Sequence, residues 1–89
     1  MVVPAGRELR ISKQADKFIR ALPAKEREAV KQGISRLIKG DMQGLDIARL
    51  LPHPKEYRLR VGKVRILFES SRERLFIFKA EYRGSVYKQ

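Results

Sequence analysis

The sequence predicts a small α+β domain. An N-terminal strand and an antiparallel helical hairpin precede a three-stranded antiparallel meander, and both helices pack on one face of the sheet. Helical spacing of apolar residues in the first half and alternation in the second half predict this order. Gly62-Lys63 supplies a two-residue turn between two alternating runs. The chain has 89 residues, 43% of them hydrophobic, so we expect a single domain spanning residues 1–89 with one core.

The first two elements are a short strand and a helix. Leu9 and Ile11 alternate with polar residues, which predicts a strand over residues 7–11. Ser12 is a favourable N-cap for a helix. The apolar residues that follow recur at helical spacing: Ala15, Phe18, Ile19 and Leu22. Pro23 ends this helix.

A second helix is predicted over residues 24–39, and Gly40 is its expected C-cap. Its apolar stripe consists of Ala29, Val30, Ile34, Leu37 and Ile38. Little more than a proline turn separates the two helices, which favours an antiparallel pair.

Residues 41–55 carry loop-forming residues, so we expect an irregular segment. Gly44, Pro52 and Pro54 break any regular pattern there. The segment also contains four aliphatic residues that we expect to anchor it to the core: Leu45, Ile47, Leu50 and Leu51.

Three strands complete the domain, over residues 56–61, 64–69 and 75–80. Gly62 as the first residue of the turn favours a type II′ hairpin. Residues 70–74 form a looser hairpin, and residues 82–89 form a polar tail.

The Gly62-Lys63 turn fixes which side chains share a face. It places Val61 opposite Val64 and Arg60 opposite Arg65. The core face should hold Tyr57, Leu59, Val61, Val64, Ile66 and Phe68, continued by Phe76, Phe78 and Ala80. The outer face should hold Arg58, Arg60, Arg65, Leu67, Ile77 and Lys79.

The outer face is too cationic for a second core. We expect Lys79 to lie across from Arg65, with Glu69 as the nearest acid, toward the far end. Like charges that face each other destabilise a sheet, so a gathered set of arginines indicates a phosphate-binding surface. The alternative is a solvated outer face. Arginines that point in different directions, or that bond to carboxylates of their own chain, would contradict the phosphate-binding interpretation.

The overall charge also indicates an anionic partner. With 21 Lys and Arg against 10 Asp and Glu, the formal net charge is +11. This excess suits nucleic acid, an acidic protein or an anionic membrane surface, although it also favours solubility.

Composition argues against a metal site, a membrane span and a secretion signal. The absence of cysteine excludes disulfides and thiolate metal sites, and one histidine disfavours zinc, so we expect no metal or cofactor. No apolar run is long enough for a membrane span. Residues 1–6 do not resemble a secretion signal. A reducing, cytoplasmic setting is compatible with these features.

Four stretches resemble the RelE group of the RelE/ParE toxin superfamily. They are YRLRVG at residues 57–62, VRILF at residues 64–68, KAEYRGSVY at residues 79–87, and the opening SKQADKFIRALP at residues 12–23. The likeness spans nearly the whole chain, and the ending is its most specific part.

The resemblance implies a small basic toxin that enters the ribosomal A site and cuts mRNA there. It also implies a cognate antitoxin, acidic and flexible, that wraps the toxin. The family's site positions fall on Arg58, Arg60, Arg65, Arg83 and Tyr87. Of these, Arg60, Arg65, Arg83 and Tyr87 would serve catalysis. Arg58, Lys63, Lys79 and Lys88 would bind RNA.

The implied reaction is a metal-independent transesterification. The RNA 2′-hydroxyl attacks the adjacent phosphate and leaves a 2′,3′-cyclic phosphate and a free 5′-hydroxyl. In the best-known members lysines occupy the places of Arg58 and Arg60, and one of them acts as the general base. Arginine is a poor base at neutral pH. The proton acceptor therefore stays open among Lys79, His53 and Glu81.

Two other functions are compatible with the sequence. One is inhibition of DNA gyrase, as in the ParE branch, although the RGSVY ending at residues 83–87 argues against it. The other is a catalytically weak or inactive homologue that binds an antitoxin or operator. The arginines at the lysine positions favour this reading.

Overall fold

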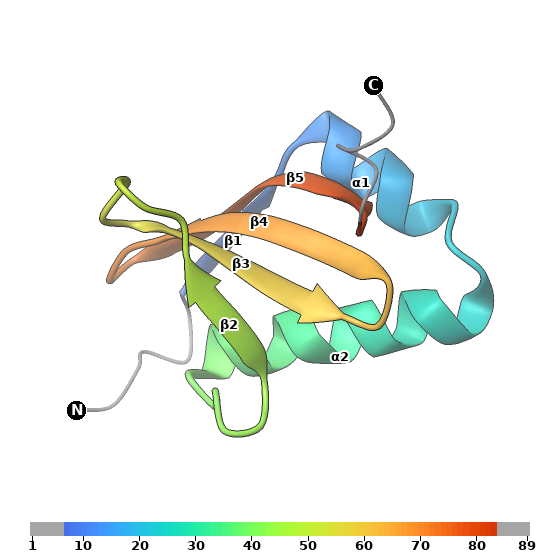
Figure 1. The fold of residues 1–89 in the computed structure, drawn as a ribbon, viewed down its shortest axis with the longest axis horizontal. Helices are drawn as coiled ribbons and strands as arrows, with labels where there is room; N and C mark the ends of the chain where they lie inside the picture. Colours follow the sequence, from blue (N-terminus) through green and yellow to red (C-terminus); the bar gives the residue numbers. More distant parts are fainter. Residues whose placement is uncertain (1–6, 84–89) are drawn as a thin grey trace.

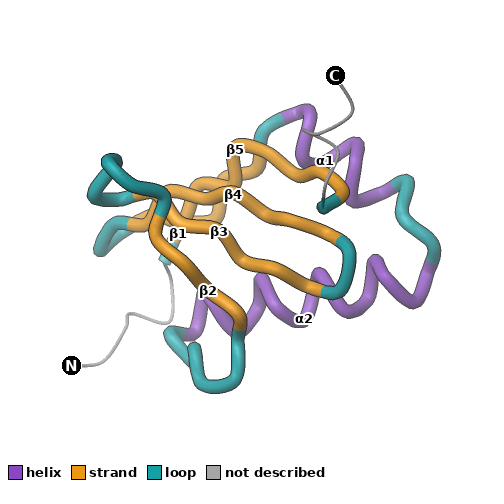
Figure 2. Tube along the Cα trace, in the orientation of Figure 1, coloured by secondary structure: helices purple, strands orange, loops and turns teal. Residues whose placement is uncertain are grey.

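The computed structural model describes residues 7–83 and shows a five-stranded mixed sheet with two helices on one face (Figure 1). The elements in chain order are β1 (Glu8–Ile11), α1 (Lys13–Arg20), α2 (Ala24–Lys39), β2 (Asp46–Arg49), β3 (Glu56–Val61), β4 (Val64–Ser70) and β5 (Arg74–Tyr82). The strand order is β1-β5-β4-β3-β2. β1 runs parallel to β5, and the other neighbours are antiparallel. Figure 2 shows β2, β3 and β4 side by side. The predicted α+β class is confirmed.

Caps confirm the predicted start of α1 and the predicted end of α2, whereas α1 ends at Arg20, before the predicted end at Pro23. The Ser12 hydroxyl oxygen accepts a hydrogen bond from the Ala15 amide at 3.1 Å, which satisfies a free donor at the start of α1. Gly40 adopts the left-handed conformation with φ 78°, which glycine enters without strain. The next amide, of Asp41, then bonds back to the Arg36 carbonyl and closes α2. A hydrogen bond from Arg36 lowers the pKa of the Asp41 carboxyl.

The Gly62-Lys63 turn is also confirmed. Gly62 has φ 58°, whereas no other residue type in the described chain has positive φ. Positive φ at the first turn position alone is the pattern of a type II′ turn. Val61 pairs with Val64 and Arg60 with Arg65, as the sequence predicts.

The segment between α2 and β3 is more regular than expected. It contains the edge strand β2, which pairs antiparallel with β3 and sets Ile47 opposite Leu59. Leu45 and Ile47 pack against the core, as expected. The expectation for Leu51 is wrong, since it is 78% exposed beside the proline turn. The prediction of an irregular segment fails because a short strand can form between loop-forming residues when a paired neighbour supplies its hydrogen bonds.

A bulge in β5 changes which residues face the core. Leu67 pairs with Lys79, but the next residue, Phe68, pairs with Ile77, so Phe78 is an extra residue on β5. Ile77 is therefore fully buried, and Ala80 resumes the core face after the bulge. The prediction that Phe76 and Phe78 face the core, with Ile77 outside, is wrong. Phe76 instead lies opposite the exposed Glu69.

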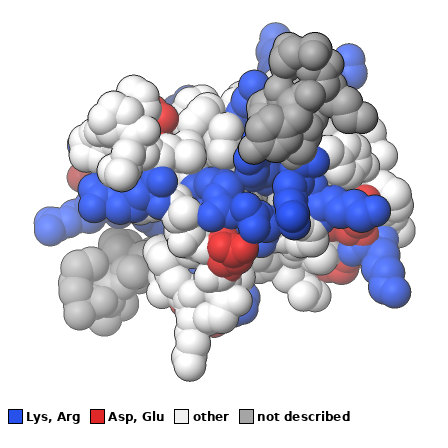
Figure 3. Space-filling view, viewed as in Figure 1, with Lys and Arg blue, Asp and Glu red and all other residues white. Residues whose placement is uncertain are grey.

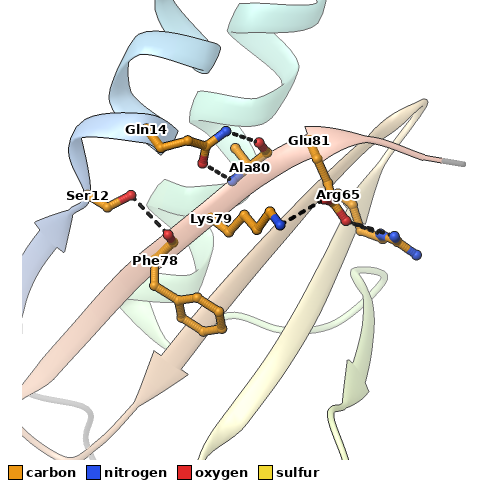
Figure 4. A network of polar contacts seen from close by, with 7 residues as sticks. All are labelled: Ser12, Gln14, Arg65, Phe78, Lys79, Ala80 and Glu81. Atoms are coloured by element: carbon orange, nitrogen blue, oxygen red, sulfur yellow. Dashed lines mark hydrogen bonds and ion pairs between the residues drawn. The ribbon is translucent and has the colours of Figure 1, made fainter. Parts of the chain in front are cut away.

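Side chains of α1 hold the bulge in place. β1 ends at Ile11, so β5 has no neighbouring strand on that side beyond Ile77. The Ser12 hydroxyl donates to the Phe78 carbonyl at 3.0 Å. The Gln14 amide donates to the Ala80 carbonyl at 2.6 Å and accepts from the Ala80 amide at 3.0 Å (Figure 4). These contacts fix which of the last side chains of β5 face the core and which face outward.

The buried core joins both helices to the sheet. It consists of Ala15, Ile19, Leu22, Val30, Ile34, Leu37, Leu59, Val64, Ile66, Phe68, Leu75, Ile77 and Ala80. Gly33 of α2 lies against β3, where an added Cβ would meet Leu59 at 3.3 Å. Neither helix in residues 7–83 is long and apolar enough to cross a membrane.

We predict that Gln14→Ala lowers the free energy of unfolding by about 1–3 kcal/mol, because both polar groups of Ala80 lose their partner. Urea denaturation measures the change. The control is Lys13→Ala on the same helix turn, which should stay within about 0.5 kcal/mol of the parent protein. Equal effects of the two substitutions would contradict the role of Gln14.

Candidate nucleic-acid interface

Four charged residues stand in one row across the outer face of the sheet. Asp46 on β2 pairs with Arg60 on β3, Arg60 pairs with Arg65 on β4, and Arg65 pairs with Glu81 on β5. Directly paired residues share a face of the sheet. We call Asp46, Arg60, Arg65 and Glu81 the charged row. Two arginines stand at its centre, and one carboxylate stands at each end.

The β5 end of the charged row is a close ion pair. Arg65 donates from Nε at 3.2 Å and from Nη2 at 2.7 Å to Oε2 of Glu81 (Figure 4). Only 19% of the Arg65 side chain and 10% of the Glu81 side chain are exposed. Nζ of Lys79 lies 3.6 Å from Oε1 of Glu81. Both oxygens of this carboxylate therefore face cations.

The β2 end of the charged row is looser. The Asp46 carboxylate lies 3.7 Å from a guanidinium nitrogen of Arg60 and 3.7 Å from one of Arg58. These distances exceed those of a hydrogen bond. Nη1 of Arg58 and Nε of Arg60 are buried and have no hydrogen-bond partner. Because these two nitrogens are buried, a ligand on this face would meet Arg60 through the 36% of its side chain that is exposed.

Two expectations about this face are wrong. Glu81, not Lys79, lies opposite Arg65, and Lys79 lies opposite Leu67. Asp46 and Glu81 also join the arginines, where the sequence indicated no acid other than Glu69. The β5 bulge brings Glu81 to this face, and the unpredicted strand β2 brings Asp46.

The arginines nevertheless gather on one face, as predicted. Arg65 does bond to a carboxylate of its own chain, which is the arrangement stated above as contradicting the phosphate-binding interpretation, so the prediction is wrong for this arginine as a free group. Arg58 and Arg60 only approach a shared carboxylate. Around the charged row, four cations (Arg58, Arg60, Arg65 and Lys79) stand against two acids (Asp46 and Glu81), so this part of the face stays cationic, while Glu56 and Glu69 lie at its far end. Figure 3 shows Lys and Arg side chains as a band across this view, with an acidic patch beside it.

Lys63 and Arg83 stand at the end of the β4–β5 ladder. The Arg83 amide donates to the Lys63 carbonyl at 2.6 Å, which brings the two backbones together. Both residues are exposed, and neither side chain forms an ion pair with residues 7–83. The predicted site residues Tyr87 and Lys88 lie outside the described residues.

The three candidate proton acceptors differ in position. Lys79 and Glu81 lie beside the charged row, although Glu81 is engaged by cations. His53 lies in the exposed loop before β3, at the end of that strand away from Arg60. The structure therefore does not bring His53 together with the other candidates.

Asp46 is a residue of this face that sequence reasoning missed. It sits between Gly44 and Pro52, in a segment whose composition indicates a loop. The alternation of Leu45 and Ile47 around it is the one signal of a strand.

Arg60 and Asp46 also line a small cavity between the sheet and α2. It holds about 250 Å³ and is bounded on the helix side by Gly33 and Arg36. A larger groove of about 670 Å³ lies between β1 and the two helices, away from the charged row.

No protein-family model matches the sequence, and no curated protein matches it either. Solved structures do match. A chain of the RelB-RelE antitoxin-toxin complex from Methanococcus jannaschii gives a TM-score of 0.74 at 24% identity, covering 88% of this chain and 94% of that chain. A chain of the archaeal RelE-RelB complex from Pyrococcus horikoshii gives 0.76 at 21% identity, covering 90% and 98%.

The isolated RelE toxin from E. coli also matches, with a TM-score of 0.68 at 19% identity, covering 91% of this chain and 90% of that one. Each of the three matches covers nearly the full length of this chain and of the matched chain. The chain therefore has the fold of RelE toxins, which confirms the predicted fold.

We predict that Glu81→Ala lowers the free energy of unfolding by about 1–3 kcal/mol, since Arg65 would lose its partner in a largely buried place. Asp46→Ala, at the exposed and looser end of the charged row, should change it by less than about 1 kcal/mol. Urea denaturation of the two variants side by side makes the comparison. A larger loss for Asp46→Ala would contradict the assignment of the tighter pair to β5.

Proposed function

We propose that the chain is the toxin of a type II toxin–antitoxin system, and that it cleaves mRNA in the ribosomal A site. The observation that carries this proposal is the charged row. It sets Arg60 and Arg65 side by side on the exposed face of a RelE fold, next to further cations. Single-stranded RNA presents phosphates that guanidinium groups bind in a fork geometry. The ribosome would hold the message in place. A cytoplasmic location follows from this substrate.

The proposed chemistry is an internal displacement. The 2′-hydroxyl oxygen attacks the adjacent phosphorus and loses its proton, and the bond from phosphorus to the 5′-oxygen breaks. The products are a 2′,3′-cyclic phosphate and a 5′-hydroxyl. Arg60, Arg65 and Arg83 would stabilise the charge that builds on the phosphate oxygens, which needs no metal. Tyr87 would stack on a base or orient the hydroxyl.

The remaining cations would hold the message. Arg58, Lys63, Lys79 and Lys88 would neutralise RNA phosphates, so binding should weaken as salt rises. Lys79 lies near the charged row and is exposed over about half of its side chain. Lys79 and Glu81 form an ion pair with each other, however, and His53 is distant, so the described residues do not single out one proton acceptor.

One observation favours a second candidate function. Arg65 is bonded within the chain to Glu81, and Arg58 and Arg60 replace the lysines of the best-known toxins. A protein with this site could bind RNA or an antitoxin with little cleavage. The ParE-like alternative, gyrase inhibition, gains no support from the described face.

We propose an acidic antitoxin as the protein partner. The 670 Å³ groove offers it an apolar surface, because Leu9 and Ile11 on β1 are each 37% exposed there. Ile19, Ile34 and Ile38 complete the apolar lining. Arg20, Arg27 and Lys31 add positive charge against one acid, Asp16, which pairs with Arg20 at 3.0 Å. An acidic segment with spaced apolar residues fits this chemistry. Two of the matching structures are themselves toxin–antitoxin complexes.

We predict that the wild-type protein cuts translated mRNA at A-site codons, and that Arg83→Ala lowers the cleavage rate by about 100-fold or more. Primer extension on mRNA from expressing cells measures both. The matched control is Arg72→Ala, an exposed arginine in the β4–β5 turn with no bond to residues 7–83. DNA damage without RNA cuts would instead indicate the gyrase alternative. Neither effect, with antitoxin binding retained, would indicate the non-catalytic one.

We predict that Leu9→Lys weakens binding of the antitoxin by about tenfold or more, because a charge would enter the apolar groove. The proposal predicts a short acidic reading frame beside this gene, and calorimetric titration with its product measures the affinity. Leu51→Lys is the matched control, since Leu51 is an exposed leucine outside the groove. Equal affinities of the two variants would place the antitoxin elsewhere.

A further inference from the structure

The two carboxylates of the charged row have no role in the proposed reaction so far. We propose that Asp46 and Glu81 are positioning residues that hold Arg60 and Arg65 as a facing pair, so that the two guanidinium groups bind one RNA phosphate together. This inference rests on the proposed function, since it deepens the same site.

The central arginines repel each other in the free protein. Arg60 and Arg65 are directly paired across β3 and β4, and facing like charges destabilise a sheet. Each arginine has a carboxylate on its outer side, Asp46 beyond Arg60 and Glu81 beyond Arg65. The carboxylates therefore draw the arginines outward and offset their repulsion while the site is empty.

The hydrogen-bond donors of Arg65 are only partly used. A guanidinium group has five N–H donors. Two nitrogens of Arg65, Nε and Nη2, donate to the same oxygen of Glu81, so Nη1 keeps both of its hydrogens for another partner. On the other side the Arg60 side chain is 36% exposed, and its guanidinium group lies 3.7 Å from Asp46 without a hydrogen bond to residues 7–83. A phosphate over the row can thus reach the exposed nitrogens of Arg60 and Nη1 of Arg65 without displacing Glu81.

The charges of the row sum to zero, from Arg60 and Arg65 against Asp46 and Glu81. The row therefore contributes geometry rather than long-range attraction. The attraction for RNA comes from cations outside the row, among them Lys63, Lys79 and Arg83. Neutralising one carboxylate should then raise the affinity for RNA, because a negative charge is lost, and lower the rate of cleavage, because an arginine loses its fixed position.

Carboxylates that compete with RNA would give a different result from carboxylates that position the arginines. Carboxylates that merely compete with RNA for the arginines would act as inhibitors of the site. Their removal would then raise both the affinity for RNA and the rate of cleavage. The direction of the rate change therefore distinguishes a positioning carboxylate from a competing one.

The experiment uses Glu81→Gln and Asp46→Asn in the full chain. Gln keeps the size of Glu81 and a hydrogen-bond acceptor, which protects the fold. We measure the dissociation constant for a labelled single-stranded RNA oligonucleotide, and kcat and KM on ribosomes programmed with a short mRNA. Glu69→Gln is the matched control, because it removes an exposed acid from β4 outside the charged row and changes the net charge equally.

We expect Glu81→Gln to bind RNA a few-fold more tightly and to lower kcat by about 10- to 100-fold, because Arg65 loses its fixed orientation. Asp46→Asn should do the same to a smaller extent, since its contacts are longer. Glu69→Gln should tighten binding equally and leave kcat unchanged. Glu81→Asp, which restores the charge, should recover part of the rate.

A kcat for Glu81→Gln that equals or exceeds that of Glu69→Gln would overturn the inference. So would a drop that Glu81→Asp does not relieve at all. Loss of the proposed function itself gives a different result, because the wild-type protein would then fail to cut the programmed mRNA. In that case the opposed carboxylates can still be tested, since Arg65 Nε–H signals in NMR spectra should change in Glu81→Gln and not in Glu69→Gln.

Discussion

The hydrogen bonds between the start of α1 and the bulge of β5 are the constraint on which the rest of the structure depends. Ser12 and Gln14 reach the Phe78 and Ala80 backbones where β1 no longer runs beside β5. They fix an extra residue at Phe78, so that Ala80 returns to the core and Glu81 faces Arg65. Without the bulge, the register of the first half of β5 would place Ala80 opposite Arg65 and Glu81 opposite the buried Val64, so Glu81 would leave the outer face.

The predictable part of the fold was the part set by neighbours in sequence. Ser12 and Gly40 cap helices through contacts within a few residues, and the Gly62 turn fixes the pairing of β3 with β4. The β5 bulge was not predictable, because Phe76, Ile77 and Phe78 are all apolar and fit either phase. The distant Ser12 and Gln14, which bond to the Phe78 and Ala80 backbones, favour one phase over the other. Strand β2 was hidden for a related reason, since its hydrogen bonds come from β3.

The candidate site also has a part that the sequence predicted and a part that it did not. The shared face of Arg58, Arg60 and Arg65 follows from alternation about one turn and was predicted. The acids beside them depend on β2 and on the bulge, so the sequence indicated a bare row of arginines where the structure has arginines held by carboxylates. The face is accordingly less positive and more ordered than composition suggested. That change shifts the expected role of Arg65 from attracting RNA to orienting one phosphate.

The central claim is that Arg60 and Arg65 together hold the scissile phosphate of a message in the ribosomal A site. An electron cryo-microscopy structure of the Arg83→Ala variant on a programmed ribosome tests it most directly. The account predicts both guanidinium groups within hydrogen-bond distance of one mRNA phosphate, with Glu81 still bonded to Arg65. A message that passes along another surface, or a charged row turned away from the A site, would contradict it.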